Sequence, residues 1–214
     1  MSKRAQKLSI GEKLGYSLGD SAANFVFQTM IMFQLFYYTN ILGISAGAAG
    51  TLLLVARIWD AIFDPFMGII ADKTSTRWGK FRPWLIWTAL PFGILFYLTF
   101  MTPVIAQGAK LAWAYINYIL MMMIYSANNL PYSALGGVMT GDMVERTSIA
   151  SYRQVAAMGA AFVIQGFFMS MVKHFSHGSD VHGWRVSIGI FAGIAVIFHL
   201  ITFLSTKERI VPKK

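Results

Sequence analysis

Six long apolar runs, separated by short polar connections that often contain glycine or proline, constrain the fold of this 214-residue chain more than any other feature. A helix of about 20 apolar residues crosses the ~30 Å hydrocarbon core of a bilayer. In lipid, a helix satisfies all of its backbone N–H and C=O groups internally. We therefore predict an all-α membrane protein whose six transmembrane helices form a bundle over residues 14–205, at about 14–42, 47–72, 82–103, 110–138, 148–173 and 184–205.

The basic residues are distributed unevenly between the two sides of this predicted bundle. Most of the 18 Lys and Arg residues lie at the two ends of the chain and in the second and fourth connections. Cytoplasmic segments of membrane proteins carry such an excess of Lys and Arg. We therefore expect both termini in the cytoplasm, with residues 1–13 as an N-terminal segment and residues 206–214 as a basic tail of a multi-pass membrane protein.

The same distribution indicates which partners the chain has. A formal net charge of +9 on one soluble face would suggest nucleic acid. Here the positive charges follow the membrane topology, so we expect the lipid bilayer as a partner and no nucleic acid. The chain has no cysteine, and His174, His177 and His182 read as solvated loop residues. No metal site and no cofactor are predicted.

The second apolar run contains three charged side chains on one helical face. Arg57, Asp60 and Asp64 are spaced at i, i+3 and i+7, so they can meet each other or a shared ligand. Charges inside a bilayer are costly, and two carboxylates one turn apart cannot both stay ionised cheaply. We expect Asp60 and Asp64 to share a proton or bind a small cation, with Arg57 as their charge partner. The alternative is that Arg57 neutralises one carboxylate as part of helix packing.

Other predicted spans contain polar side chains at similar depths. The first carries Asp20 and Asn24, the fourth carries Ser126 and Asn129, and Arg153 lies about one turn into the fifth. Such groups often hydrogen-bond between membrane helices, and an arginine near a helix end can extend to the interface. Because three helices bring polar groups to one depth, a polar cavity is the favoured interpretation.

The connection after the second run contains a short motif, Gly68-Ile69-Ile70-Ala71-Asp72-Lys73 followed by Arg77-Trp78-Gly79-Lys80. This spacing of Gly, Asp, Arg, Gly and Lys resembles the cytoplasmic signature of major facilitator transporters. The resemblance implies a latch in which Asp72 pairs with Arg77 or Lys80 between the ends of neighbouring helices.

Longer motifs make the resemblance more specific. They are Gly15-Tyr16-Ser17-Leu18-Gly19-Asp20, Arg57-Ile58-Trp59-Asp60-Ala61 continuing to Asp64-Pro65, Arg77-Trp78-Gly79-Lys80-Phe81-Arg82-Pro83-Trp84 and Asn129-Leu130-Pro131-Tyr132-Ser133-Ala134-Leu135. Together they are similar to the glycoside-pentoside-hexuronide:cation symporters, the melibiose permease-like branch of the major facilitator superfamily. The resemblance covers about residues 12–209 and corresponds to the N-terminal half of the family's twelve-helix fold.

The resemblance implies roles for individual residues. Asp60, Asp64 and Ser126 take the positions that bind the coupling cation, and Phe63 replaces an amide found between the two carboxylates, which leaves H+ and Na+ both open. Asn24 and Asn129 replace two sugar-binding acids, and Ser133 replaces a sugar-stacking Trp, so galactoside specificity is not implied. Arg153 matches a substrate contact, and Asp20 belongs to a pattern of other family branches.

The function implied is secondary active symport of a sugar or glycoside with H+ or Na+ in a bacterial inner (plasma) membrane. Such a transporter works by rocking two halves against each other, so the chain is expected to need a C-terminal half or partner chain. A truncation, a split gene and a self-pairing half all stay open, as do the sugar and the coupling ratio. The alternative is a non-transporting six-helix half with a structural role. The sequence has no nucleophile–base pair and no phosphate loop, so an enzyme is not expected.

Overall fold

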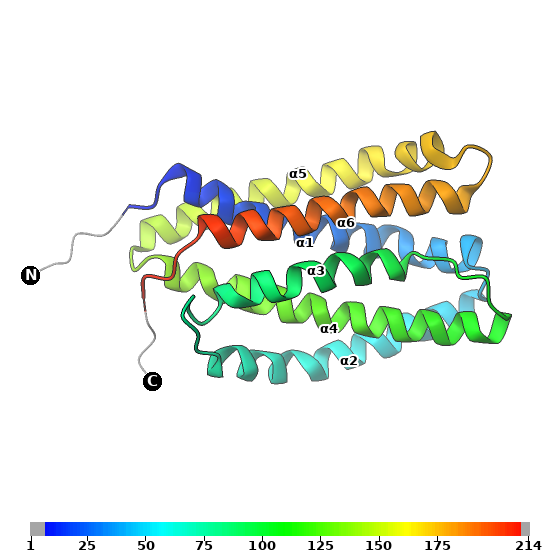
Figure 1. Ribbon diagram of the computed structural model, residues 1–214, viewed down its shortest axis with the longest axis horizontal. Coiled ribbons are helices and arrows are strands. Elements are labelled where there is room, and N and C mark those ends of the chain that lie inside the picture. The colour runs from blue at the N-terminus through cyan, green and yellow to red at the C-terminus, as the bar shows by residue number, and fades with distance from the viewer. Residues whose placement is uncertain (1–6, 211–214) are drawn as a thin grey trace, which may run out of the picture.

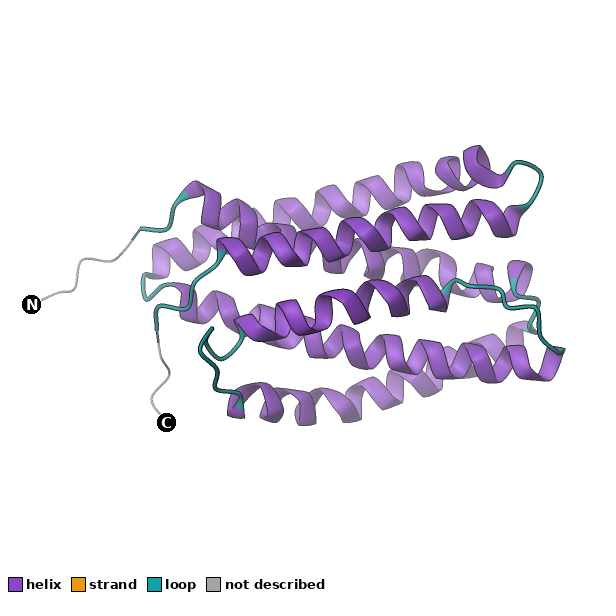
Figure 2. Ribbon diagram, in the orientation of Figure 1, coloured by secondary structure: helices purple, strands orange, loops and turns teal. Residues whose placement is uncertain are grey.

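A computed structural model describes residues 7–210, and every regular element in that part of the chain is a helix (Figure 2). Six α-helices follow one another, and the first continues into one π-helical turn, η1, at Tyr37–Ile41. The α-helices are α1 Ile10–Phe36, α2 Ala46–Lys73, α3 Arg82–Thr99, α4 Gln107–Met139, α5 Met143–Ser176 and α6 Asp180–Ser205. The predicted all-α architecture with six helices is confirmed.

Local chemistry explains where these helices begin and end relative to the expected ranges. The α5 helix begins five residues earlier than residue 148 because the Asp142 side chain caps it, accepting a 2.8 Å hydrogen bond from the Val144 amide. The α3 helix ends at Thr99, before the expected residue 103. Residue 103 is a proline, which disfavours a helical conformation at the preceding residue.

The helices run up and down and pack in two groups of three (Figure 1). In one group α1, α5 and α6 contact one another, and in the other α4 lies between α2 and α3. The two groups are joined mainly along α3 and α6, whereas α1 makes few contacts with α2 or α4. We call the loosely packed line between α1 and the α2/α4 pair the seam. Residues 7 and 210 and the connections 74–81 and 140–142 lie at one end of the bundle, the proximal end, and the other connections lie at the distal end.

The distal end is held by a cluster of aromatic rings around the fully buried Trp184 of α6. Its indole stacks on Phe100 with ring centroids 5.8 Å apart and also contacts Tyr37 and Phe168 at 5.1 and 5.2 Å. The Tyr37 hydroxyl donates to the Phe100 carbonyl at 2.7 Å. Aromatic rings of this size bury large apolar areas, so the cluster fixes the distal ends of α1, α3, α5 and α6 together.

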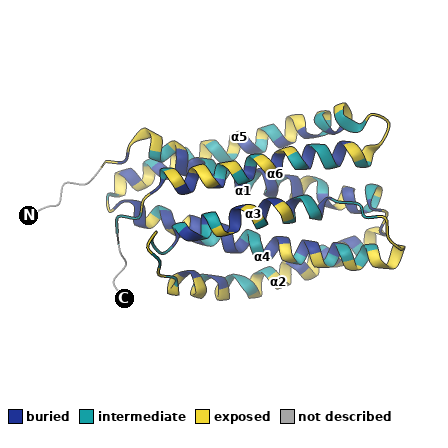
Figure 3. Ribbon diagram, in the orientation of Figure 1, coloured by how far each residue is buried: buried dark blue, intermediate teal, exposed yellow. Residues whose placement is uncertain are grey.

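The outward faces of the helices are exposed (Figure 3), and on several helices they carry large apolar side chains. On α2, Leu54, Ile58, Ile62, Phe66 and Ile69 follow helical spacing and are each more than half exposed. Two of the described helices, α5 and α6, are long and apolar enough to cross a membrane by length and composition. The assignment of α1–α4 as membrane spans therefore stays a proposal.

Candidate functional site

The polar residues singled out within the apolar runs gather along the seam. Ser126 of α4 donates a hydrogen bond to Asp60 of α2, with Oγ and Oδ1 3.0 Å apart. Ser126 is buried and Asp60 half-buried. The structure thus brings together two of the three residues expected to bind a cation, from helices that are 66 residues apart in sequence.

Asp64 lies one turn further along α2, toward the proximal end. Its Oδ1 atom is buried and has no hydrogen-bond partner among residues 7–210. A buried carboxylate oxygen without a partner is costly unless a proton or a cation satisfies it. Asp60 and Asp64 therefore form a pair of carboxyl groups with unused capacity for one positive charge.

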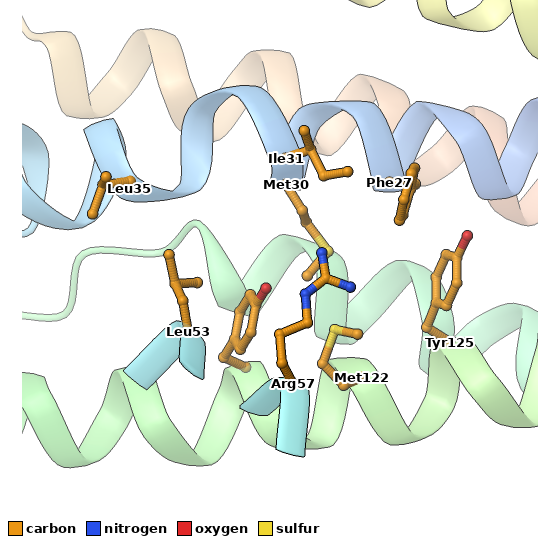
Figure 4. Close-up of a pocket in the computed structure, with 9 residues that line it drawn as sticks. Phe27, Met30, Ile31, Leu35, Leu53, Arg57, Met122 and Tyr125 are labelled. Atoms are coloured by element: carbon orange, nitrogen blue, oxygen red, sulfur yellow. The ribbon is translucent and has the colours of Figure 1, made fainter. Parts of the chain in front are cut away.

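The direction of the Arg57 side chain bears on its predicted role as charge partner of Asp60 and Asp64. Within the described part of the chain its guanidinium makes no ion pair with Asp60 or Asp64. The side chain instead extends into a cavity of about 310 Å³ on the distal side of Asp60, between α1, α2 and α4 (Figure 4). Sequence spacing placed Arg57 on the correct helical face but could not specify this direction.

Asp20 of α1 and Arg153 of α5 form an ion pair with N···O 3.3 Å. The guanidinium also lies over the rings of Tyr132 and Tyr16, at 4.8 and 5.6 Å from their centroids. These two rings stack 4.7 Å apart, and each hydroxyl donates to the other residue's carbonyl. Both tyrosines belong to the sequence motifs, but nothing local indicates that they pair across 116 residues.

The two asparagines predicted to bind substrate, Asn24 and Asn129, lie on α1 and α4, on the two sides of the seam. The Asn24 side chain is half-buried and donates from Nδ2 to the Asp20 carbonyl of its own helix at 2.9 Å, which leaves its oxygen available. Asn129 is half-buried, and its side chain makes no hydrogen bond within residues 7–210. Its neighbour Asn128 is buried and donates to Thr88 at 2.7 Å, which is a packing role.

Similarity to known proteins identifies the family of this chain. The model of the family described as MFS/sugar transport protein matches residues 15–214. The chain belongs to this family. The predicted resemblance to major facilitator sugar transporters is therefore confirmed.

Three relatives show how far the similarity to other members of the MFS/sugar transport family extends. The inner membrane symporter YicJ of Escherichia coli is 40% identical over 97% of this chain and 45% of its own length. The isoprimeverose transporter of Lactiplantibacillus pentosus is 40% identical over 93% of the chain and 42% of its own length. The glucuronide carrier protein homolog of E. coli is 38% identical over 96% of the chain and 45% of its own length. The chain thus spans a little under half the length of these curated relatives.

The proximal end of this family member contains the residues of the expected latch. Lys80 pairs with Asp72, with Nζ and Oδ1 2.9 Å apart, and this joins the end of α2 to the start of α3. Arg77 does not join the pair, and its guanidinium instead stacks 4.8 Å from the Trp78 ring centroid. The structure therefore supports one of the two basic partners considered for Asp72.

Glu208 makes contacts at the proximal end that were not predicted from the sequence. Its carboxylate accepts hydrogen bonds from the backbone amides of Lys80, Phe81 and Arg82 at 2.7–2.9 Å, which are unpaired donors at the start of α3. Gly79 has φ +115°, and a Cβ there would collide with the Glu208 carboxyl group. No sequence signal distinguishes Glu208 from an ordinary charged tail residue.

Replacing Glu208 with Ala is expected to lower the free energy of unfolding by about 2 kcal/mol, because three amides at a helix start lose a charged acceptor. Thermal unfolding of the purified chain in detergent measures this. Lys207→Ala is the matched control, since Lys207 is exposed in the same tail. Equal unfolding temperatures for the two variants would contradict the assigned role of Glu208.

Two further ion pairs connect the proximal segments. Lys13 lies 2.8 Å from Glu145, which also accepts from the Leu8 amide, and Arg209 pairs with Glu12. The hydrogen bond from Lys13 is the main reason that the pKa of Glu145 lies below its ordinary value of 4.5. Burial raises the pKa of Glu12, but hydrogen bonds from Arg209 and Ser9 outweigh it and leave that pKa lowered as well.

These lowered pKa values predict an acid-sensitive stability. The carboxylates contribute stability above the ordinary pKa of about 4.5, and this contribution is lost as pH falls through their lower native pKa values. A Glu12→Gln/Glu145→Gln variant should unfold several degrees below wild type near pH 6 and converge with it near pH 3. A gap in unfolding temperature that stays constant over this range would contradict the assignment.

Proposed function

We propose that this chain forms the N-terminal half of a secondary active transporter that carries a sugar or glycoside together with H+ or Na+. The observation that carries the proposal is the hydrogen-bonded Ser126–Asp60 pair one turn from the unpartnered Asp64 oxygen, on a helix whose outer face is apolar. Ionisable groups inside an apolar bundle typically mark ion or substrate pathways.

All six helices cross the membrane in this proposal. The exposed apolar residues of α2 and α5 face lipid or a neighbouring bundle. The excess of basic residues supports a cytoplasmic location for the proximal end and both termini. One relative is named as an inner membrane symporter, which supports a bacterial inner membrane as the location. The second half of the transporter, in the same or a separate chain, covers the apolar faces that this half leaves open.

The coupling cation binds at Asp60, Asp64 and Ser126. Two carboxylates and a hydroxyl supply oxygen ligands for Na+, and the same carboxylates can share one proton instead. In either case the arriving positive charge relieves the repulsion between Asp60 and Asp64. Phe63 lies between the two carboxylates in sequence and offers no ligand atom. Both Na+ and H+ are therefore tested as the coupling cation.

The sugar contacts polar groups along the same seam, with Asp20, Asn24, Asn129 and Arg153 as the proposed substrate-binding residues. Cation binding stabilises an arrangement of α1, α2 and α4 that also binds sugar, so each ligand raises the affinity for the other. The Asp72–Lys80 pair is the proposed cytoplasmic latch, which restrains the α2–α3 connection while the two halves rock. Arg77 contributes to that connection through its stacking on Trp78.

Uptake into proteoliposomes tests this function. The full-length transporter that contains this half is reconstituted. Uptake of radiolabelled glycosides, pentosides and hexuronides is then followed under an imposed Na+ or pH gradient. We expect one of the two gradients to stimulate uptake of at least one sugar on the order of 10-fold. No stimulation by either gradient for any sugar would contradict the proposal and would favour a non-transporting half.

A further inference from the structure

The cavity beside Arg57 has the composition of a site for a sugar ring. It holds about 310 Å³, at the lower end of the range of about 300–1,000 Å³ typical of small-molecule pockets. Its walls come from the three helices of the seam: Phe27 and Met30 on α1, Arg57 on α2, and Tyr118, Met122 and Tyr125 on α4 (Figure 4). Aromatic and apolar walls with a single charged group are typical of such pockets.

The guanidinium of Arg57 is unused in this structure. Arg presents five N–H donors and no acceptor, and none of these donors bonds to a residue within 7–210. Arg153, by contrast, is engaged by Asp20 and by two tyrosine rings. Arg57 is an exposed side chain, so these donors are accessible to a ligand with acceptor groups that enters the cavity.

Two aromatic rings in the wall of this cavity offer flat apolar faces. Phe27 and Tyr125 stack across the seam with ring centroids 6.0 Å apart and planes inclined by 26°. Sugars present a face of C–H groups on one side and hydroxyls around the ring edge. A ring lying against Phe27 or Tyr125 therefore turns its hydroxyls toward the guanidinium.

Charge decides which kind of sugar suits this position. Arg57 and one bound cation balance the two carboxylates Asp60 and Asp64, so the seam is neutral when a neutral sugar enters. A hexuronide carboxylate would leave one uncompensated negative charge in an apolar bundle, which is costly. The arrangement favours a neutral glycoside or pentoside.

We propose that Arg57 is a substrate-binding residue that determines specificity for a neutral sugar ring, held in the cavity beside the stacked rings of Phe27 and Tyr125, and that it balances the charge of Asp60 and Asp64 without a direct ion pair. This inference rests on the proposed transport function. It places one ring of the sugar three residues along α2 from Asp60, so that this ring and the cation occupy adjacent positions on one helix face. Asp20, Asn24, Asn129 and Arg153 do not line this cavity and contact the rest of the glycoside in this proposal.

Transport kinetics of Arg57→Gln and Arg57→Lys in proteoliposomes test the proposal. We expect both variants to raise the KM for the sugar at saturating cation by at least about 10-fold, because neither side chain reproduces the planar fork of donors. Vmax should stay within about threefold, and in Arg57→Lys, which keeps the positive charge, the cation concentration for half-maximal uptake, measured at sugar far below KM, should stay unchanged. Arg185→Gln, outside the cavity, is the matched control and should leave the KM at its wild-type value.

The opposite pattern would overturn the proposal. If Arg57 only neutralises the carboxylates, Arg57→Gln shifts the cation dependence with the sugar KM unchanged, and Arg57→Lys restores wild-type behaviour. A wild-type preference for hexuronides over the matching neutral glycosides would overturn the assignment to a neutral ring. Absence of cation-stimulated uptake in the wild type would instead show that the underlying transport function is wrong, so the two failures are distinguishable.

Monodeoxy analogues of the transported sugar give a second readout that does not depend on how well the variants fold. The analogue that lacks the hydroxyl contacted by Arg57 should bind wild type at least about 10-fold more weakly than the parent sugar. Arg57→Gln should bind that analogue and the parent sugar almost equally. If every deoxy analogue loses as much affinity in Arg57→Gln as in wild type, Arg57 contacts no sugar hydroxyl.

Discussion

Asp60→Asn should reduce cation-driven sugar uptake on the order of 100-fold, the largest functional loss expected for any single substitution in this chain. The amide preserves the size of the side chain and can still contact Ser126, but it carries no negative charge to hold a cation and cannot take up a proton. Initial rates of uptake under the gradient that drives the wild type measure the loss. Sugar equilibration without a gradient should be reduced much less.

Ser126→Ala is the matched control for this prediction. It removes the hydroxyl that donates to Asp60 and leaves both carboxylates in place, so we expect a loss on the order of 10-fold. Two results would contradict the account: cation-driven uptake by Asp60→Asn at the wild-type rate, or a Ser126→Ala defect larger than that of Asp60→Asn.

Arg153→Gln should lower the free energy of unfolding by about 3 kcal/mol, because it leaves the Asp20 carboxylate unpaired in a largely buried position. The exposed fractions of the two side chains are 27% for Arg153 and 15% for Asp20, so solvent screens this pair less than a surface pair. For a chain of this size the change corresponds to a fall of roughly 10 °C in the unfolding temperature. Thermal unfolding in detergent measures it.

A second substitution separates charge from packing at this pair. Asp20→Asn added to Arg153→Gln removes the uncompensated charge, so the double variant should regain most of the lost stability. The stacking of Arg153 on Tyr16 and Tyr132 is lost in both variants and explains any remaining deficit. Additive losses in the double variant would show that Asp20 and Arg153 are not coupled.

The sequence predicted the helices and the shared helical face of Asp60 and Asp64 for reasons that lie in local chemistry. Continuous apolar runs broken by polar connections specify membrane helices, and the spacing of Asp60 and Asp64 places both on one helical face whatever the packing. The hydrogen bond from Ser126 confirms that α2 and α4 meet at that depth.

The direction of the Arg57 side chain could not be predicted. Helical spacing allows its guanidinium to reach forward toward Asp60 or back into the cavity, and the choice depends on how α1, α2 and α4 pack around that cavity. The contact of Glu208 with the start of α3 could not be predicted either, because it joins backbone amides to a side chain 126–128 residues away in sequence. Both depend on tertiary placement, which no local pattern encodes.

The most direct test of the proposed cation-coupled site is the effect of the cation on sugar affinity at equilibrium. Affinity of the reconstituted protein for its transported sugar is measured with and without Na+ and between about pH 5 and pH 8, for wild type and for Asp60→Asn. The account predicts that Na+ or acid raises the affinity of wild type on the order of 10-fold and leaves that of Asp60→Asn unchanged. Sugar affinity that is independent of both cations in wild type, or that responds equally in Asp60→Asn, would contradict it.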